Sequence, residues 1–219
     1  MKPLIFFDIN GTLITRDEKT DLPFSRAVDR FLDSHGGMEG IDTSARSDKD
    51  VFIEVLANHR MQFTERQWDF FLSLYEEELA RFAESDIWRP NADVCPFIRH
   101  LFERDYPLAL ITGELSRGAE YKLRKIGLWD FFIAGGFGED ALYRFGIAEA
   151  ARSKAKEKLG ALPDTLYVIG DTVLDIQTAR HLNAKAIAIT TGSHSREKLS
   201  KENPDYCIDN FETIKSLFN

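Results

Sequence analysis

Two segments far apart in the chain place carboxylates at the ends of apolar runs. The first segment reads FFDINGTLI, in which Asp8 follows Leu4–Phe7 and a Gly-Thr turn comes shortly after. The second reads LYVIGDTVLD, in which Asp171 ends another apolar run and Asp175 follows four residues later. A carboxylate at such a position can act as a nucleophile or bind a divalent cation, provided that nearby positive groups keep it ionised. Taken singly, each of these aspartates is also an ordinary turn or helix-capping residue.

Two further features have the residue types that bind a phosphoryl group. Thr112 ends the apolar run LALIT and is followed by Gly113, so that a hydroxyl group and main-chain amides would form a small anion cradle. Arg144 precedes a helical pattern and is the preferred cation for the same group. The alternative is a lysine of that helix, such as Lys154, although lysines spaced by two scatter around a helix surface. Arginine or lysine stays open at this point.

These residues need a scaffold in which several strands end at the same edge. Short apolar runs alternate with helical patterns, which favours an α/β fold, a three-layer Rossmann-like core with a parallel sheet buried on both faces. Open sheets of this kind bind ligands at the carboxyl ends of their strands. Strands are expected at Leu4–Asp8, Leu108–Thr112, Phe131–Ala134, Leu166–Gly170, Ala186–Thr190 and Tyr206–Ile208, and helices at Val94–Arg104, Arg117–Ile126, Gly146–Leu159, Val173–Leu182 and Phe211–Phe218.

The segment from about Thr15 to Trp88 breaks this alternation, because it shows amphipathic helical patterns and no strand. Ser47 with Asp50 is typical of a capping box that begins a helix. A stripe of aromatic residues at helical spacing is expected to pack inside this segment rather than to bind a ligand. We therefore expect two domains, an α/β core formed by residues 1–14 and 89–219 and an all-helical cap formed by residues 15–88.

Composition limits the classes of partner. The chain has 219 residues, 43% of them hydrophobic, which is enough for a sizeable core. A net charge of −8 argues against nucleic acid as a partner. Two isolated cysteines, an early first strand and the lack of a long apolar run predict a cytoplasmic protein that does not bind a membrane. The oligomeric state stays open, and a monomer is compatible with the sequence.

In this order, these features resemble the haloacid dehalogenase (HAD) superfamily, most of whose members are Mg²⁺-dependent phosphatases. The stretch DINGTL is similar to the first motif of that family, Thr112 to the second, and GDTVLD to the fourth. The segment DIQTARHLNAKAIAITTGSHSREKL resembles phosphoglycolate-phosphatase-like members, and the helical insertion resembles their cap. The third motif usually supplies a lysine, and FGEDALYRFGI is similar to a subgroup with an arginine there.

The resemblance implies a mechanism. Asp8 would attack phosphorus and form an aspartyl-phosphate, and the cap would close over a small phosphorylated metabolite. The implied ligands of Mg²⁺ are Asp8, the main-chain carbonyl of Asn10 and Asp171, with Asp175 in support. The implied phosphate-binding residues are Thr112, Gly113 and Arg144.

Asn10 departs from the family pattern, which has an aspartate two residues after the nucleophile. That aspartate protonates the leaving group and then activates water, whereas an amide transfers no proton. We therefore expect turnover to be lower by about 10²–10⁴-fold, the usual contribution of general acid–base catalysis. Four explanations stay open: an engineered change, a natural loss of turnover, substrates with good leaving groups, or a different chemistry within the superfamily.

Three alternatives to an active phosphatase follow. The chain could be a weakened or inactive relative that binds a phospho-ligand or a protein partner. It could be a dehalogenase-type hydrolase, although the dehalogenases and phosphonate-cleaving members of the superfamily usually have tyrosine or alanine at the position of Asn10. A receiver-type signalling domain is disfavoured, because Asp8 lies on the first strand and a helical insertion has no place there.

Overall fold

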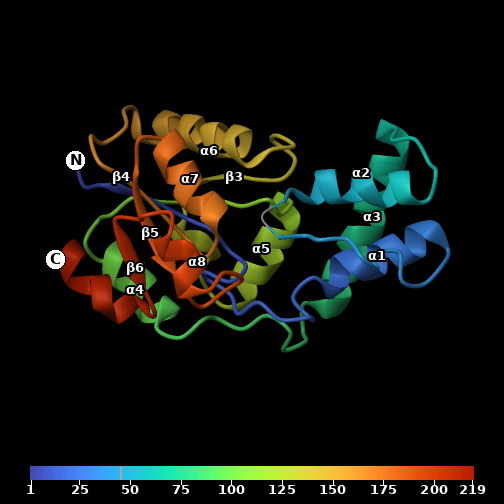
Figure 1. The fold of residues 1–219 in the computed structure, drawn as a ribbon, viewed down its shortest axis with the longest axis horizontal. Coiled ribbons are helices and arrows are strands. Elements are labelled where there is room, and N and C mark those ends of the chain that lie inside the picture. Colours follow the sequence, from blue (N-terminus) through green and yellow to red (C-terminus); the bar gives the residue numbers. More distant parts are fainter. Residues whose placement is uncertain (45) are drawn as a thin grey trace.

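The computed structural model describes residues 1–44 and 46–219 and has an α/β core with a helical insertion, as Figure 1 shows. The core sheet is parallel, and its strands lie in the order β3-β2-β1-β4-β5-β6. The strands are β1 (Leu4–Phe7), β2 (Leu108–Ile111), β3 (Ala134–Gly136), β4 (Leu166–Gly170), β5 (Lys185–Ile189) and β6 (Tyr206–Ile208). The predicted α/β fold with a parallel sheet is confirmed. Because β1 lies between β2 and β4, the loops after these three strands are neighbours.

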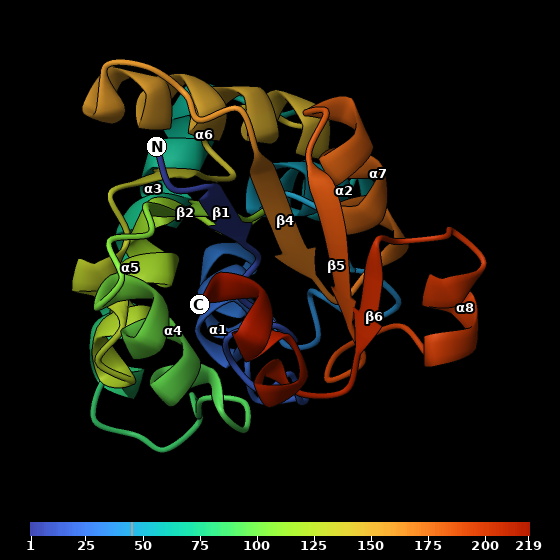
Figure 2. The ribbon, with the colours of Figure 1, turned by 90° about the vertical axis from the view of Figure 1, so that its left-hand side faces the viewer.

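Helices cover both faces of the sheet (Figure 2). The core helices are α4 (Val94–Phe102), α5 (Ser116–Lys125), η1 (Trp129–Phe131), α6 (Arg144–Leu159), α7 (Val173–His181), α8 (Arg196–Ser200) and η2 (Phe211–Phe218). Successive residues of β1 point to opposite faces, as in any strand. Phe6 packs in a cluster with residues of α6 and α7, whereas Phe7 packs in the larger cluster that includes α4, α5 and η2.

The insertion between β1 and β2 is helical, as predicted, and lies to one side of the sheet (Figure 1). It contains α1 (Leu22–Leu32), α2 (Asp48–Asn58) and α3 (Glu65–Phe82). Its core is a cluster of aromatic rings: Phe52 stacks on Phe71 with centroids 4.4 Å apart, and Phe24 meets Phe71 edge to face with centroids 5.0 Å apart. Such contacts between rings stabilise the bundle beyond the burial of apolar area.

The predicted third strand is displaced. Instead of a strand at Phe131–Ala134, Trp129–Phe131 forms the short helix η1 and the strand is Ala134–Gly136. Gly136 has to be glycine, because a Cβ there would lie 2.1 Å from the main-chain oxygen of Ile147 in α6. Close packing of a helix against the strand thus places glycines in a strand, where propensity alone disfavours them.

No helix within the described parts of the chain combines the length and the apolar character needed to cross a membrane. Cys95 and Cys207 are both unpaired and half-buried.

Candidate active site

The residues predicted to do chemistry line a single pocket at the carboxyl ends of β1, β2 and β4. Asp8 follows β1 directly, Thr112 follows β2, and Asp171 follows β4. The pocket is lined by all seven predicted site residues: Asp8, Asn10, Thr112, Gly113, Arg144, Asp171 and Asp175. The fold therefore brings together groups that lie up to 167 residues apart, from Asp8 to Asp175 (175 − 8).

The turn after Asp8 is fixed against Asp171. Gly11 has a φ of +88°, and a Cβ at this position would lie 2.6 Å from Asp171 Oδ2, so that only glycine fits. The Thr12 hydroxyl donates to Asp171 Oδ1 at 3.3 Å. The Asn91 side-chain amide donates to the main-chain oxygens of Gly11 and Thr12 at 3.0 and 2.9 Å. These bonds hold the first and fourth sequence motifs in one rigid arrangement.

Arg144 is the cation that reaches this centre. It is the first residue of α6, is 7% exposed, and donates to Asp8 Oδ1 at 2.9 Å and to Asp175. Its buried Nε has no hydrogen-bond partner among the residues that the structure describes, so that one guanidinium donor is available to a ligand. Lys154 instead pairs with Asp140 at the surface. The geometry thus favours Arg144 over the lysine alternative.

Asp175 mainly holds other groups of the site in place. Its Oδ2 accepts the main-chain N–H of Thr172 at 3.0 Å, and its own main-chain N–H donates to the Thr172 hydroxyl at 3.3 Å, which forms a capping box at the start of α7. The Thr172 hydroxyl also donates to Asp175 Oδ2 at 2.6 Å. Its Oδ1 binds Arg144. Both carboxylate oxygens therefore have partners within the protein, and Asp175 orients the guanidinium toward Asp8.

The pocket concentrates buried carboxyl groups. Burial raises the pKa of Asp8 to about 8; Arg144 opposes the shift, and Asp175 and Asp171 add to it. Burial and then Asp175 raise the pKa of Asp171. Within the described ranges no Lys, Arg or His forms an ion pair with Asp171, which is fully buried and accepts the Ser193 N–H at 2.5 Å. A further positive charge between these two carboxyl groups would favour their ionised forms.

The donor set fits a hard cation that keeps water ligands. Residues 1–44 and 46–219 contain no group of three or more His, Cys, Asp or Glu side chains arranged to hold a metal ion. A cation beside Asp8 and Asp171 would therefore have two carboxylate ligands, with main-chain oxygen and water completing its shell. Mg²⁺ is commonly bound in this way.

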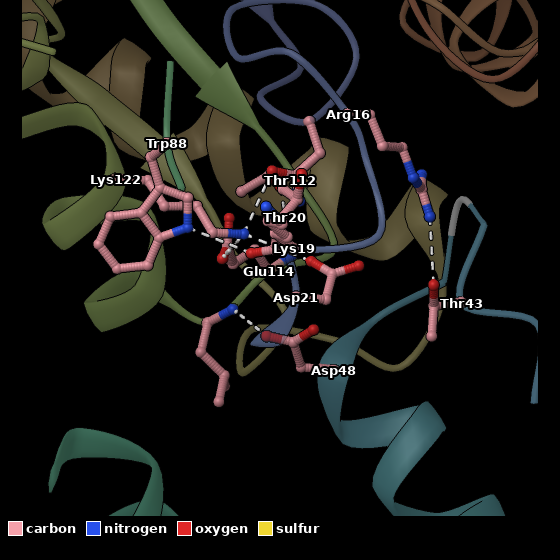
Figure 3. Close-up of polar contacts among 12 residues, drawn as sticks. Arg16, Lys19, Thr20, Asp21, Thr43, Asp48, Trp88, Thr112, Glu114 and Lys122 are labelled. Atoms are coloured by element: carbon pink, nitrogen blue, oxygen red, sulfur yellow. Dashed lines mark hydrogen bonds and ion pairs between the residues drawn. The ribbon is translucent and has the colours of Figure 1, made fainter. Parts of the chain in front are cut away.

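Sequence inspection missed Lys122, the second buried cation of the pocket. Its Nζ lies 2.6 Å from Glu114 and 3.4 Å from Asp21 (Figure 3). The same Nζ lies 3.2 Å from Asn10 Oδ1. Burial lowers the pKa of Lys122, but Glu114 and Asp21 more than offset this effect and raise it overall, so that the ammonium stays charged. Its signal was present in the sequence, because Lys122 is three residues after Ala119, on the buried face of α5.

The cap meets the core beside this lysine. The main-chain N–H of Asp48, at the start of α2, donates to the Gly113 oxygen at 2.8 Å, and Asp48 Oδ2 accepts the Leu115 N–H at 2.9 Å. Burial raises the pKa of Asp48 and of Glu114. The helix predicted from the pattern of Ser47 and Asp50 begins at Asp48, and the Ser47 hydroxyl accepts the Asp50 N–H.

Two arginines also line the pocket from the cap side. Arg46 is held by Asp50 at 2.7 Å and also pairs with Glu54. Arg16 donates to Thr43 at 3.1 Å and to Ser193 of the core at 3.3 Å (Figure 3 shows its bond to Thr43). Arg16 therefore spans the boundary between the insertion and the core.

Comparison with known proteins gives a consistent result. A family model described as haloacid dehalogenase-like hydrolase matches residues 5–180, and a second, HAD-hydrolase-like model matches residues 147–214. The phosphoglycolate phosphatase of Pseudomonas putida is 26% identical over 220 residues, which cover 96% of this chain and 78% of that protein. The pyrophosphatase PpaX of Bacillus pumilus is 22% identical over 222 residues, 97% of this chain and 94% of that protein.

A solved structure has the same fold. The crystal structure of a predicted phosphoglycolate phosphatase from Haemophilus somnus aligns with a TM-score of 0.72 at 20% identity and covers 100% of this chain and 98% of that one. The first family model spans β1 to β4 and the loops that form the pocket, the second reaches β6, and the fold agrees along the whole chain. The chain therefore belongs to the haloacid dehalogenase-like hydrolases.

Proposed function

We propose that this protein is a Mg²⁺-dependent phosphate-monoester hydrolase that acts on a small phosphorylated metabolite through an aspartyl-phosphate on Asp8. The observation that carries the proposal is the position of Asp8, which lies at the end of β1 with Arg144 bonded to it at 2.9 Å and Asp171 in the same pocket. The names of the relatives, a phosphoglycolate phosphatase and a pyrophosphatase, support the broader class of phosphoryl transfer to water.

In the proposed mechanism each side chain has one task. Asp8 attacks phosphorus, while Arg144 binds phosphoryl oxygens and offsets the charge that gathers there. Thr112 is buried and its hydroxyl accepts the Glu114 N–H at 3.2 Å, which leaves the hydroxyl proton to donate to the phosphoryl group. Mg²⁺ held by Asp8, the main-chain carbonyl of Asn10 and Asp171 would neutralise phosphoryl charge. Asp175 supports the site by holding Arg144.

The same proposal assigns the domains. Residues 1–14 and 89–219 form the catalytic core, and residues 15–88 form the cap, which excludes water and selects the substrate. The contacts of Asp48 with Gly113 and Leu115 support this assignment, because they bring the cap onto the loop that carries Thr112.

Turnover is proposed to be limited by Asn10. The test is hydrolysis of an alkyl phosphate such as phosphoglycolate, with and without Mg²⁺, by this protein, by Asn10→Asp and by Asn10→Asp combined with Asp8→Ala. We expect Asn10→Asp to be faster by about 10²–10⁴-fold, because a carboxyl group can transfer the proton that an amide cannot. The activity should need Mg²⁺ and should vanish when Asp8 is also replaced.

Two outcomes would redirect the assignment. If Asn10→Asp binds a phosphate analogue such as tungstate with Mg²⁺ but hydrolyses none of a broad set of phosphate esters, the protein is a phospho-ligand-binding relative. If the double variant keeps full activity, Asp8 is not the nucleophile.

A further inference from the structure

Asn10 can take only one orientation in this pocket. The Lys122 ammonium has three N–H donors and no acceptor. The Asn10 atom that faces it at 3.2 Å is therefore the carbonyl oxygen Oδ1, because an amide nitrogen there would place donor against donor. The two N–H bonds of the Asn10 amide must consequently point away from Lys122.

Lys122 cannot move to relax this constraint. It is 2% exposed, lies on α5, and is bonded to Glu114 at 2.6 Å, which is itself 4% exposed. A third contact, to Asp21 at 3.4 Å, comes from the cap side. An ammonium with three oxygen partners has used its donor capacity, so that it acts on the reaction through Asn10 rather than by touching the substrate.

The main chain of Asn10 is held as well. Asn10 forms a β-bridge with Ile14, and the next main-chain N–H, that of Gly11, donates to the Ile14 oxygen at 2.7 Å. The Asn10 amide N–H groups have no partner among the residues that the structure describes, although the side chain lines the same pocket as Asp8 and Arg144. These two donors are therefore available to a ligand bound in this pocket.

We propose that Lys122 is a positioning residue that aims the Asn10 amide at the bridging oxygen of the substrate, so that the leaving group departs as an anion stabilised by a hydrogen bond. This proposal rests on the proposed function. In this proposal Asn10 donates a hydrogen bond at the position where the family has a general acid. The preferred substrates are then those whose leaving group is a weak base: acyl phosphates, aryl phosphates and phosphoanhydrides.

The reaction balances without a proton donor. An Asp8 oxygen bonds to phosphorus while the bond from phosphorus to the bridging oxygen breaks, and the electron pair stays on the departing oxygen as an anion. Water then attacks the phosphorus of the aspartyl-phosphate, and the bond to Asp8 breaks. The products are the Asp8 carboxylate and dihydrogen phosphate, which keeps both protons of the water and releases one to solvent near neutral pH.

The proposal therefore predicts different rates for pyrophosphate and phosphoglycolate, the substrates in the names of the two relatives. A phosphoanhydride such as pyrophosphate releases phosphate, a weak base that needs no protonation. Phosphoglycolate releases an alkoxide, a strong base that an amide donor cannot protonate. We expect the wild-type chain to prefer anhydrides and aryl esters, and Asn10→Asp to gain most on alkyl esters.

The first test is the dependence of kcat/KM on leaving-group basicity, measured with a series of substituted phenyl phosphates, acetyl phosphate, pyrophosphate and phosphoglycolate. For the wild-type protein kcat/KM should fall steeply as the leaving group becomes more basic, and for Asn10→Asp the decline should be shallower. Equal slopes would overturn the proposal. Loss of all hydrolysis in Asp8→Asn establishes the proposed function separately, and an absence of Asp8-dependent hydrolysis in both the wild type and Asn10→Asp would refute that function.

The second test is a double-mutant cycle between Asn10 and Lys122 with acetyl phosphate. Asn10→Ala should lower kcat/KM by about 10²-fold, the usual cost of one donor to a developing anion. Lys122→Met should lower it by about 10–100-fold, because a misaligned donor loses most of its effect. In Asn10→Ala, adding Lys122→Met should change kcat/KM by less than about 2-fold, since coupled residues are not additive.

Controls separate positioning from folding. Lys125→Met removes an exposed lysine of the same helix and should leave kcat/KM unchanged. Lys122→Met combined with Glu114→Gln avoids an unpaired buried carboxylate and serves where the single variant is poorly folded. A loss from Lys122→Met, or from this paired variant, that is as large in Asn10→Ala as in the wild type would show a structural role only and overturn the proposal.

Discussion

Asp8 links metal binding to pH at the scale of single residues. Burial raises its pKa to about 8, so that below this pH the carboxyl group holds a proton that a metal must displace. The apparent affinity for Mg²⁺ should therefore rise by about tenfold per pH unit between pH 6 and pH 8 and level off above. Isothermal titration with MgCl₂ at several pH values measures this dependence.

The matched control for this titration is Asp8→Asn. This substitution keeps the shape of the side chain but leaves no proton for the metal to displace. The slope of the logarithm of the Mg²⁺ affinity against pH should therefore be smaller by at least one than in the wild-type protein. A Mg²⁺ affinity that is the same at pH 6 and pH 8 in the wild-type protein would contradict the assignment of Asp8 as a ligand.

At the scale of elements, the buried carboxyl group of Asp48 at the start of α2 makes the stability of the protein depend on pH. Burial, then the neighbouring Glu114, raises the pKa of Asp48 well above its ordinary value. The folded protein thus binds this proton more tightly than the unfolded chain, so that stability falls as pH rises above about 4, by about 1.4 kcal/mol for each unit of pKa shift. Asp48→Asn keeps an oxygen to accept the Leu115 N–H and removes the charge.

Asp48→Asn should therefore be more stable than the wild-type protein at pH 8 and similar to it at pH 4.5. Urea unfolding at both pH values measures the difference. Asp69→Asn, an exposed change on α3, is the control and should alter the free energy of unfolding by no more than about 0.5 kcal/mol at either pH. A destabilised Asp48→Asn at pH 8 would mean that the ionised carboxylate is needed to hold the cap.

Most of the elements could be predicted because buried parallel strands and amphipathic helices have distinct periods. The strand Leu166–Gly170 and the segment Tyr206–Ile208 agree with the structure to the residue. The third strand could not be placed, because Gly136 is there for its close contact with α6, a tertiary constraint that no local pattern contains. Tertiary packing overrides propensity at such positions.

The residues of the candidate site could likewise be predicted only in part. Asp8, Thr112 and Asp171 follow apolar strands, so that their convergence follows from the parallel sheet. Lys122 lies on α5 and Glu114 just before it, but Lys122 also contacts Asp21 and Asn10, which lie about 100 residues earlier in the chain. A lysine on an otherwise buried helical face was the one local sign of this pair.

At the scale of the whole molecule, Arg16 connects the proposed cap to the proposed catalytic core. Its guanidinium bonds to Thr43 of the cap and Ser193 of the core. Arg16→Ala should raise KM by about 3–10-fold, since a hydrogen bond to a charged group is worth about 1.5–3 kcal/mol and these bonds are partly exposed. The value of kcat should not fall, because looser closure does not slow product release.

This prediction is best measured in the Asn10→Asp background, where turnover is expected to be higher. Arg26→Ala, at an exposed position of α1, is the matched control and should leave KM unchanged. A fall in kcat with unchanged KM would place Arg16 in the chemical step instead of in closure of the cap.

The bonds around Asn10 also govern the chemical ageing of the protein. An Asn-Gly pair deamidates when the glycine nitrogen attacks the side-chain carbonyl carbon, but here the Gly11 N–H is bonded to Ile14 and the Asn10 oxygen to Lys122. Deamidation should therefore be slow in the folded protein and fast after unfolding in urea, as peptide mass spectrometry would reveal; equal rates would contradict this. Because deamidation can yield aspartate, any molecule that unfolds, converts and refolds would regain the proton carrier that its sequence lacks.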